Sequence, residues 1–194
     1  LATGKYSQAE AQLKMALAIR ENLVTENSEL IAASYNDLGL VYSSTDANKA
    51  LHHYEKALNI YQTIHGEDHP KIAIANTNIG FVYRTLEFYG DAIINFESAL
   101  SIWEKIHEGA HPTKGFIHFN LGQTYLKMGN EKAADEFYQK ALKMYRESYG
   151  KKHPGIATVL NAIGNLKLSS GHFDDAIEYF QHAIISNVSD FNDA

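Results

Sequence analysis

The residues with the clearest chemical meaning in this sequence are His107, Glu108 and His111, in the stretch HEGAH. H-E-x-x-H is the pattern of zinc proteases, in which two histidines bind the metal and the glutamate activates a water molecule. That chemistry needs both histidines on one continuous helical face and a third ligand. Gly109 and Pro112 interrupt a helix here, and no third ligand follows at a fitting spacing. The pattern alone therefore does not predict a zinc enzyme.

Other groups that could support catalysis have simpler explanations. The acidic pairs Asp135-Glu136 and Asp174-Asp175 lie at or near expected helix starts, where negative charge suits the helix dipole. Ser43-Ser44 and Ser169-Ser170 lie at expected helix ends, without an implied base, and His52-His53 lies inside an expected helix. The sequence has neither a G-x-x-x-x-G-K-[ST] loop nor a G-x-G-x-x-G loop after a strand. We expect no enzyme activity, no metal and no cofactor.

A fixed period organises the chain. His-Pro pairs recur every 42 residues, at 69–70, 111–112 and 153–154. The segments that end in them read IHGEDHP, IHEGAHP and SYGKKHP. In this register both counterparts of Glu108 are glycines, and the last counterpart of His107 is Tyr149. HEGAH is therefore expected to be a joint between repeated units, with its proline near the first turn of the next helix. His65/His69 and His107/His111 could still bind metal adventitiously as i,i+4 pairs.

Each repeated unit carries two motifs. The first occurs as Leu38-Gly39-x-x-Tyr42, Ile79-Gly80-x-x-Tyr83, Leu121-Gly122-x-x-Tyr125 and, in degraded form, Ile163-Gly164-x-x-Lys167. The second occurs as Ala50-x-x-x-Tyr54-x-x-Ala57, Ala92-x-x-x-Phe96-x-x-Ala99, Ala134-x-x-x-Tyr138-x-x-Ala141 and Ala176-x-x-x-Phe180-x-x-Ala183. The glycine permits close approach of a second helix, and the alternation of small and large residues allows interdigitation. We therefore expect a first helix (A), a short turn and a second helix (B) in each unit, with stacked units sharing a core.

These motifs resemble the tetratricopeptide repeat, and the 42-residue spacing resembles the kinesin-light-chain type of that repeat. The resemblance implies an all-α, right-handed α-solenoid of antiparallel helix hairpins. It predicts a single array over residues 1–194. The expected parts are a half repeat with helix B only (1–28), four repeats (29–69, 70–111, 112–153 and 154–187) and a tail (188–194). The chain begins at Leu1 within an orphan helix B, so we expect it to be a fragment of a longer protein.

Composition narrows the classes of partner. The net charge is −6, which disfavours a nucleic-acid partner. No stretch approaches the roughly 18 apolar residues of a membrane span, and no signal peptide is recognisable. The absence of cysteine excludes disulfides and thiolate metal sites. These features favour a cytoplasmic protein that does not insert into membranes.

In tetratricopeptide arrays helix A lines the concave groove, so the resemblance implies that a partner binds there. Helical periodicity predicts the groove residues of helix A. They are Asn36, Asp37, Ile74, Asn78, Phe81, Arg84, Phe116, Phe119, Asn120, Gln123, Lys127, Asn161 and Asn165. Asp37, Asn78 and Asn120 share one register, which Ala162 breaks. In related groove binders an asparagine in this register holds the backbone of an extended peptide, and the similarity implies that role for Asn78 and Asn120. The alternative is that these amides bond to neighbouring A helices.

The predicted groove also contains apolar side chains, among them Ile74, Phe81 and Phe116. If exposed together they would form a binding patch, and the alternative is packing between adjacent A helices. Only Arg84 and Lys127 add positive charge, which argues against the acidic peptides of kinesin light chains and favours apolar anchors. We predict a protein–protein interaction scaffold that holds a peptide or helix of a partner. The alternative is a regulatory array that acts on an effector domain of the same longer chain. Exposed ends of such an array could also associate end to end.

Overall fold

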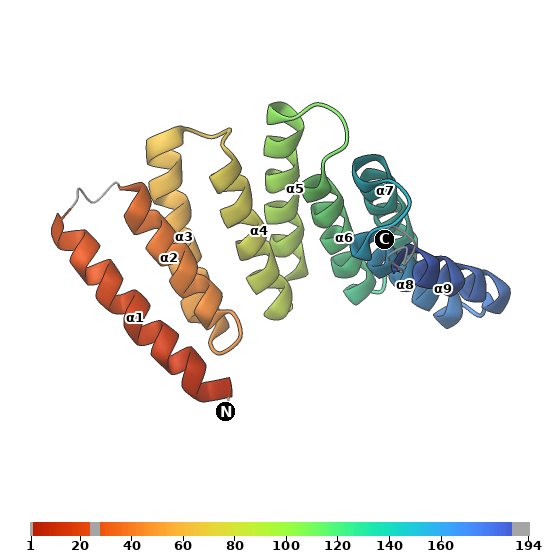
Figure 1. The fold of residues 1–194 in the computed structure, drawn as a ribbon, viewed down its shortest axis with the longest axis horizontal. Coiled ribbons are helices and arrows are strands. Elements are labelled where there is room, and N and C mark those ends of the chain that lie inside the picture. The colour runs from red at the N-terminus through yellow and green to blue at the C-terminus, as the bar shows by residue number, and fades with distance from the viewer. Residues whose placement is uncertain (1, 24–27, 188–194) are drawn as a thin grey trace, which may run out of the picture. The chain divides into compact units, whose positions relative to one another are not determined.

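The computed structural model describes residues 2–23 and 28–187, and in these ranges all regular secondary structure is α-helical (Figure 1). The helices are α1 (Ala2–Leu23), α2 (Glu29–Tyr42), α3 (Ala47–His65), α4 (Pro70–Thr85), α5 (Tyr89–Ile106), α6 (Pro112–Lys127), α7 (Glu131–Tyr149), α8 (Pro154–Ser169) and α9 (Phe173–Asn187). The predicted all-α fold of helix hairpins is confirmed. The even-numbered helices are the A helices, and the odd-numbered ones are the B helices.

The chain divides into two compact units. Unit 1 spans Leu1–Ile106 and contains α1 to α5, and unit 2 spans His107–Ala194 and contains α6 to α9. Inside unit 1, α2 packs against α3 and α4 packs against α5, and Figure 1 shows each pair side by side. Inside unit 2, α6 packs against α7 and α8 against α9. The expected tail at 188–194 lies outside the described residues, and the single array with its boundaries stays a prediction.

The His-Pro joints start three A helices in the same way. His69 has extended backbone, Pro70 occupies the first turn of α4, and His69 Nδ1 accepts the N–H of Lys71 at 3.3 Å. The same bond runs from Thr113 to His111 at 3.2 Å and from Gly155 to His153 at 3.0 Å. An acceptor at this position satisfies one of the backbone donors that a helix start leaves open. The histidine is therefore the N-cap of the helix that its proline begins.

A glycine of each described A helix lies against an aromatic ring of the following B helix. A Cβ atom built at Gly39 would lie 2.6 Å from the Tyr54 ring. The corresponding pairs are Gly80 with Phe96 at 2.8 Å, Gly122 with Tyr138 at 2.6 Å and Gly164 with Phe180 at 2.7 Å. Because protein interiors are close-packed, a larger residue would have to displace the ring. This contact fixes how closely the two helices of a hairpin approach, and it is the structural meaning of the two sequence motifs.

Each unit has its own apolar core beneath these contacts. In unit 1, Leu38, Tyr54 and Ile79 are buried in one cluster with Leu17 of α1. In unit 2, Tyr138, Leu160 and Ile163 are buried in another. Among residues 2–23 and 28–187, every helix falls short of the combined length and apolar character needed to cross a bilayer.

Candidate partner-binding face

In unit 1 the predicted groove residues lie on α2 and α4, and two of them bond to each other. Asn78 Nδ2 of α4 donates to Asn36 Oδ1 of α2 at 3.0 Å. Both side chains are half-buried, whereas Asp37 is exposed and Ile74 is 47% exposed. The Asn36–Asn78 pair therefore bridges two A helices and still reaches the surface between exposed neighbours.

A cavity of about 300 Å³ opens beside this pair. Its walls come from α2, α3 and α4 and include Leu40, Ser43, Ala47, Tyr54, Asn78, Phe81, Val82 and Thr85. Burial raises the pKa of Tyr54 to about 12. The negative charge of Asp37 also raises this pKa, whereas a hydrogen bond with Ser43 lowers it by less than burial raises it. Tyr54 is therefore protonated at neutral pH and offers a hydroxyl group rather than a base. The cavity thus combines apolar walls with an amide and a phenol, as small binding sites commonly do.

Phe81 and Arg84 of α4 are held by aromatic contacts within unit 1. The Phe81 ring meets the Phe96 ring edge-on, with centroids 5.6 Å apart. The Arg84 guanidinium carbon lies 5.0 Å from the Phe81 centroid and 5.9 Å from that of Phe96. Cation–π attraction therefore fixes Arg84 beside the ring that forms the cavity wall.

In unit 2 the predicted groove residues have different surroundings. Asn120 of α6 is 2% exposed, and its Nδ2 donates to the Phe116 carbonyl of its own helix at 2.7 Å. Phe119 packs against Tyr138, with ring centroids 5.6 Å apart, while Phe116 is 40% exposed. Gln123 is half-buried, and Lys127, Asn161 and Asn165 are exposed. The exposed polar and aromatic members, rather than Asn120, are the ones within direct reach of a partner.

The histidines that suggested zinc have structural partners. His107 and His111 have ring centroids 4.6 Å apart, and Nδ1 of His111 accepts the N–H of Thr113. At the other joints His69 stacks on His65 at 3.8 Å and His153 stacks on Tyr149 at 3.7 Å. Within the described ranges, no three histidine or acidic side chains gather in a way that could hold a metal ion. HEGAH thus supplies a helix cap, and at the last joint the counterpart of His107 is Tyr149, whose ring stacks on the capping His153.

Sequence reasoning did not select a cavity of about 590 Å³ that lies in unit 2. It opens between the end of α7 and the end of α9 and is lined by Arg146, Glu147, Gly150, Lys151, His182, Ile185 and Ser186. All of these residues belong to B helices or to a joint, whereas the groove prediction considered A helices alone. Three of the lining residues, Arg146, Lys151 and His182, are basic, and they stand out in the sequence when equivalent positions of the repeats are compared.

Comparison with known proteins gives a consistent result for the fold. The family model described as tetratricopeptide repeat matches residues 1–63, 44–87, 71–147 and 134–184. No curated protein matches the sequence.

Three solved structures illustrate the similarity. The nearly identical TPR-like repeats of a putative kinesin light chain from Podosopora anserina give a TM-score of 0.77 at 17% identity, covering 95% of this chain and 88% of that one. BtubC (BKLC) from P. vanneervenii gives 0.82 at 21%, covering 95% and 74%. A Rap protein complexed with Competence and Sporulation Factor gives 0.77 at 17%, covering 95% and 50%. Identities this low show a common fold and leave function to the residues.

Proposed function

Since the chain belongs to the tetratricopeptide repeat family, we propose that it is a protein–protein interaction scaffold whose A helices hold a peptide or helix of a partner. The observation that carries this proposal is the cavity of unit 1, where Asn78 and Phe81 meet beside the exposed Ile74. A half-buried amide can pair with a peptide backbone, because it offers both a donor and an acceptor. An exposed isoleucine and a ring edge can receive an apolar side chain of the same peptide.

The fold of the Rap protein complexed with Competence and Sporulation Factor supports the general role of a scaffold that binds another molecule. In unit 2 the corresponding contacts are assigned to Phe116, Gln123, Lys127, Asn161 and Asn165, which are exposed or half-buried. Asn36, Asp37 and Arg84 take part in unit 1. Asn120 and Phe119 hold the binding surface in place and do not contact the partner, because both side chains pack against their own hairpin.

The regulatory alternative uses the same face with another occupant. An effector domain of the same longer chain would then bind the A helices in place of a separate protein. End-to-end self-association is a separate proposal, and it rests on exposed apolar side chains of the helices that begin and end the described part. These side chains are Met15, Ile19 and Leu23 of α1 and Ile177 and Ile184 of α9.

The groove proposal can be tested with peptides selected on the chain from a random library. Ile74→Ser and Asn78→Ala should each weaken the selected peptides about three- to tenfold, as expected for loss of one apolar contact or one hydrogen bond. Fluorescence anisotropy gives the Kd. Ile94→Ser and Asn59→Ala are matched controls on the B helices α5 and α3, where both residues are exposed. Equal affinities for all four variants, with helical content preserved, would show that the A-helix face is not the binding site.

A further inference from the structure

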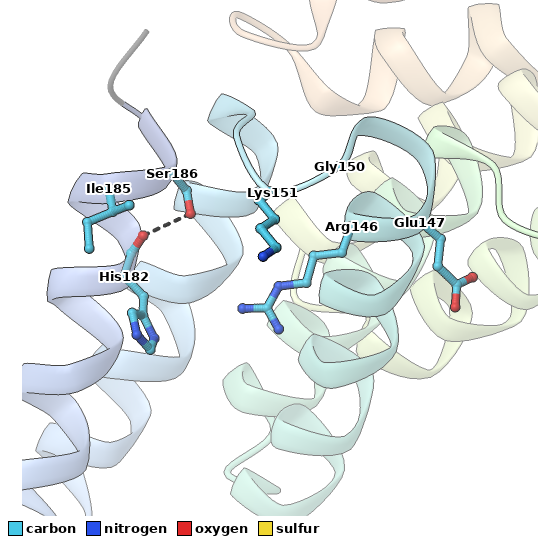
Figure 2. A pocket seen from close by; sticks show the side chains of 7 residues that line it. All are labelled: Arg146, Glu147, Gly150, Lys151, His182, Ile185 and Ser186. Carbon is cyan, nitrogen blue, oxygen red and sulfur yellow. Dashed lines mark hydrogen bonds between the residues drawn. The ribbon is translucent and has the colours of Figure 1, made fainter. Parts of the chain in front are cut away.

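The cavity between the ends of α7 and α9 gathers basic side chains of unit 2. Figure 2 shows the Arg146 guanidinium and the Lys151 ammonium group extending into the opening, toward the side on which α9 carries His182. Glu147, which follows Arg146 on α7, points away from them. The opening therefore presents two permanent cations and an imidazole to whatever enters it.

Among the described residues of unit 2, other basic side chains form ion pairs that Arg146 and Lys151 do not form. Lys167 pairs with Asp135 at 3.0 Å, and Lys143 approaches Glu147 at 3.9 Å. Within residues 28–187 neither Arg146 nor Lys151 forms an ion pair with a carboxylate. The Ser186 hydroxyl, which also lines the cavity, donates to the His182 carbonyl at 2.8 Å. Two cations that line one cavity favour an anionic ligand, and a guanidinium matches the two oxygens of a carboxylate.

The fold does not require a basic cluster at this place, as unit 1 shows. Two periods of 42 residues earlier, the positions of Arg146, Lys151 and His182 are occupied by Gln62, Glu67 and Ser98. Gln62 Nε2 donates there to Glu67 Oε2 at 3.2 Å. At the equivalent place between α3 and α5, these two side chains thus bond to each other, and the Glu67 carboxylate gives the site a negative charge. The basic residues of unit 2 are a local feature of α7, α9 and the joint after α7.

The surroundings of the cavity restrict the kind of anion. Ile185 is 58% exposed at the rim and offers an apolar contact. A second cavity of about 460 Å³ shares Arg146 and His182 and is also lined by Asp175 and Glu178. Those two carboxylates and the net charge of −6 oppose a long polyanion such as nucleic acid. A single carboxylate next to an aliphatic side chain satisfies both the cations and Ile185.

We propose that this cavity is a second binding site, which takes an acidic peptide segment of a partner protein with a glutamate or aspartate beside an aliphatic residue. The carboxylate lies between Arg146 and Lys151, and the aliphatic side chain rests on Ile185. The volume of about 590 Å³ is in the usual range of binding pockets. This site lies on B helices and uses none of the residues assigned to the A-helix face, so the two proposals can fail separately.

The test measures direct binding of a labelled Glu-Leu peptide, with one Glu-Leu pair between neutral serine and glycine residues, to the full chain by fluorescence anisotropy. Arg146→Gln with Lys151→Gln should weaken binding by about tenfold or more, the loss expected when a charge-assisted hydrogen bond is removed. Lys132→Gln with Lys140→Gln is the matched control. It removes the same charge from exposed positions of α7 that do not line the cavity. The unmodified chain should bind a Gln-Leu peptide no more tightly than the double variant at Arg146 and Lys151 binds the Glu-Leu peptide.

Four outcomes would overturn the proposal. These are no binding of the Glu-Leu peptide at millimolar concentration, equal binding of the Gln-Leu peptide, or equal weakening in the control variant. The fourth is much tighter binding of a phosphoserine peptide, which would make phosphate the preferred ligand. A chain without residues 188–194, which include Asp190 and Asp193, provides one further arm. Binding by that shortened chain alone would be a fifth such outcome, because it would mean that the protein's own acidic segment takes the place of the partner.

Discussion

The two units share their hairpin construction and differ in how they use one polar position of helix A. Asn78 in unit 1 bonds to Asn36 of the neighbouring A helix at 3.0 Å and borders a cavity. Its counterpart in unit 2, Asn120, is 2% exposed and bonds to the backbone of its own helix. The same amide in the same register thus links two helices in one unit and fills the interior in the other. A repeated residue type shows an equivalent position, but its neighbours decide whether it can meet a partner.

The shared construction gives the largest expected effect. Gly80→Ala in unit 1 and Gly122→Ala in unit 2 would each place a methyl group 2.6 to 2.8 Å from an aromatic ring. We expect each to lower the free energy of unfolding by about 1–3 kcal/mol, because overpacking outweighs the helical preference for alanine. Urea denaturation followed by circular dichroism gives the loss for each variant. Similar losses in both units would confirm the common construction.

Gly90→Ala is the control for this pair. Gly90 lies in the first turn of α5, and an added Cβ meets nothing within 4 Å. Alanine should therefore leave stability unchanged or raise it by up to about 1 kcal/mol. A loss at Gly90 as large as that at Gly80 would mean that the ring contacts are not the cause.

A half-buried histidine gives the next effect and belongs to unit 2. Burial, with smaller contributions from Lys140 and Lys114, lowers the pKa of His118 from its ordinary 6.5 to about 4. The unfolded chain therefore binds this proton more readily, so the stabilisation is complete above about pH 6.5 and declines as pH falls toward 4. His118→Asn introduces the residue that occupies the same register in unit 1. This change should remove up to about 3 kcal/mol of the stability that the protein loses between pH 7 and pH 4. Urea unfolding of both proteins at pH 7 and pH 4 measures the difference.

Comparison of the two proteins separates His118 from the other groups that titrate in this range. His111 of the same unit, and His53 and His69 of unit 1, also have pKa values lowered mainly by burial, and they are unchanged in the variant. If His118→Asn loses as much stability between pH 7 and pH 4 as the unmodified chain, the acid sensitivity arises at these other histidines or at the carboxylates.

The smallest effect concerns the amides themselves. Asn120→Ala should cost about 1–2 kcal/mol, because it removes a buried hydrogen bond and leaves a small void. Asn78→Ala should cost about 0.5–1 kcal/mol, since its hydrogen bond to Asn36 is only half-buried. The order of the two losses in urea unfolding is the readout. A reversed order would mean that Asn78 has the structural role and Asn120 the freer one.

The sequence predicted the helix hairpins because their cause is local spacing. A glycine that meets a ring, and a His-Pro pair that caps a helix, recur at fixed distances along the chain and can be recognised without coordinates. The direction of an asparagine side chain cannot be recognised in this way. It depends on which acceptors lie within reach, and the donated bonds run to Asn36 Oδ1 on α2 for Asn78 and to the Phe116 carbonyl for Asn120.

The basic cavity was missed for another reason. Arg146 and His182 lie on different B helices and meet only through the stacking of one hairpin on the next. Position-by-position comparison of the repeats would have identified them, because Arg146 and Lys151 replace Gln62 and Glu67. In a repeat protein, departures from the average unit are thus the most informative places to look for binding residues.

The His-Pro joint has a consequence for how such a chain changes length. At the first joint the ring stack, the helix cap and the glycine with φ of +75° all lie within residues 65–71. A gene segment that encodes 42 residues would therefore carry a complete joint wherever it is copied. Duplication or deletion of one such segment keeps the cap and the ring contact of the remaining joints intact. The length of the protein can thus evolve in whole cassettes, while substitutions within a cassette set what it binds.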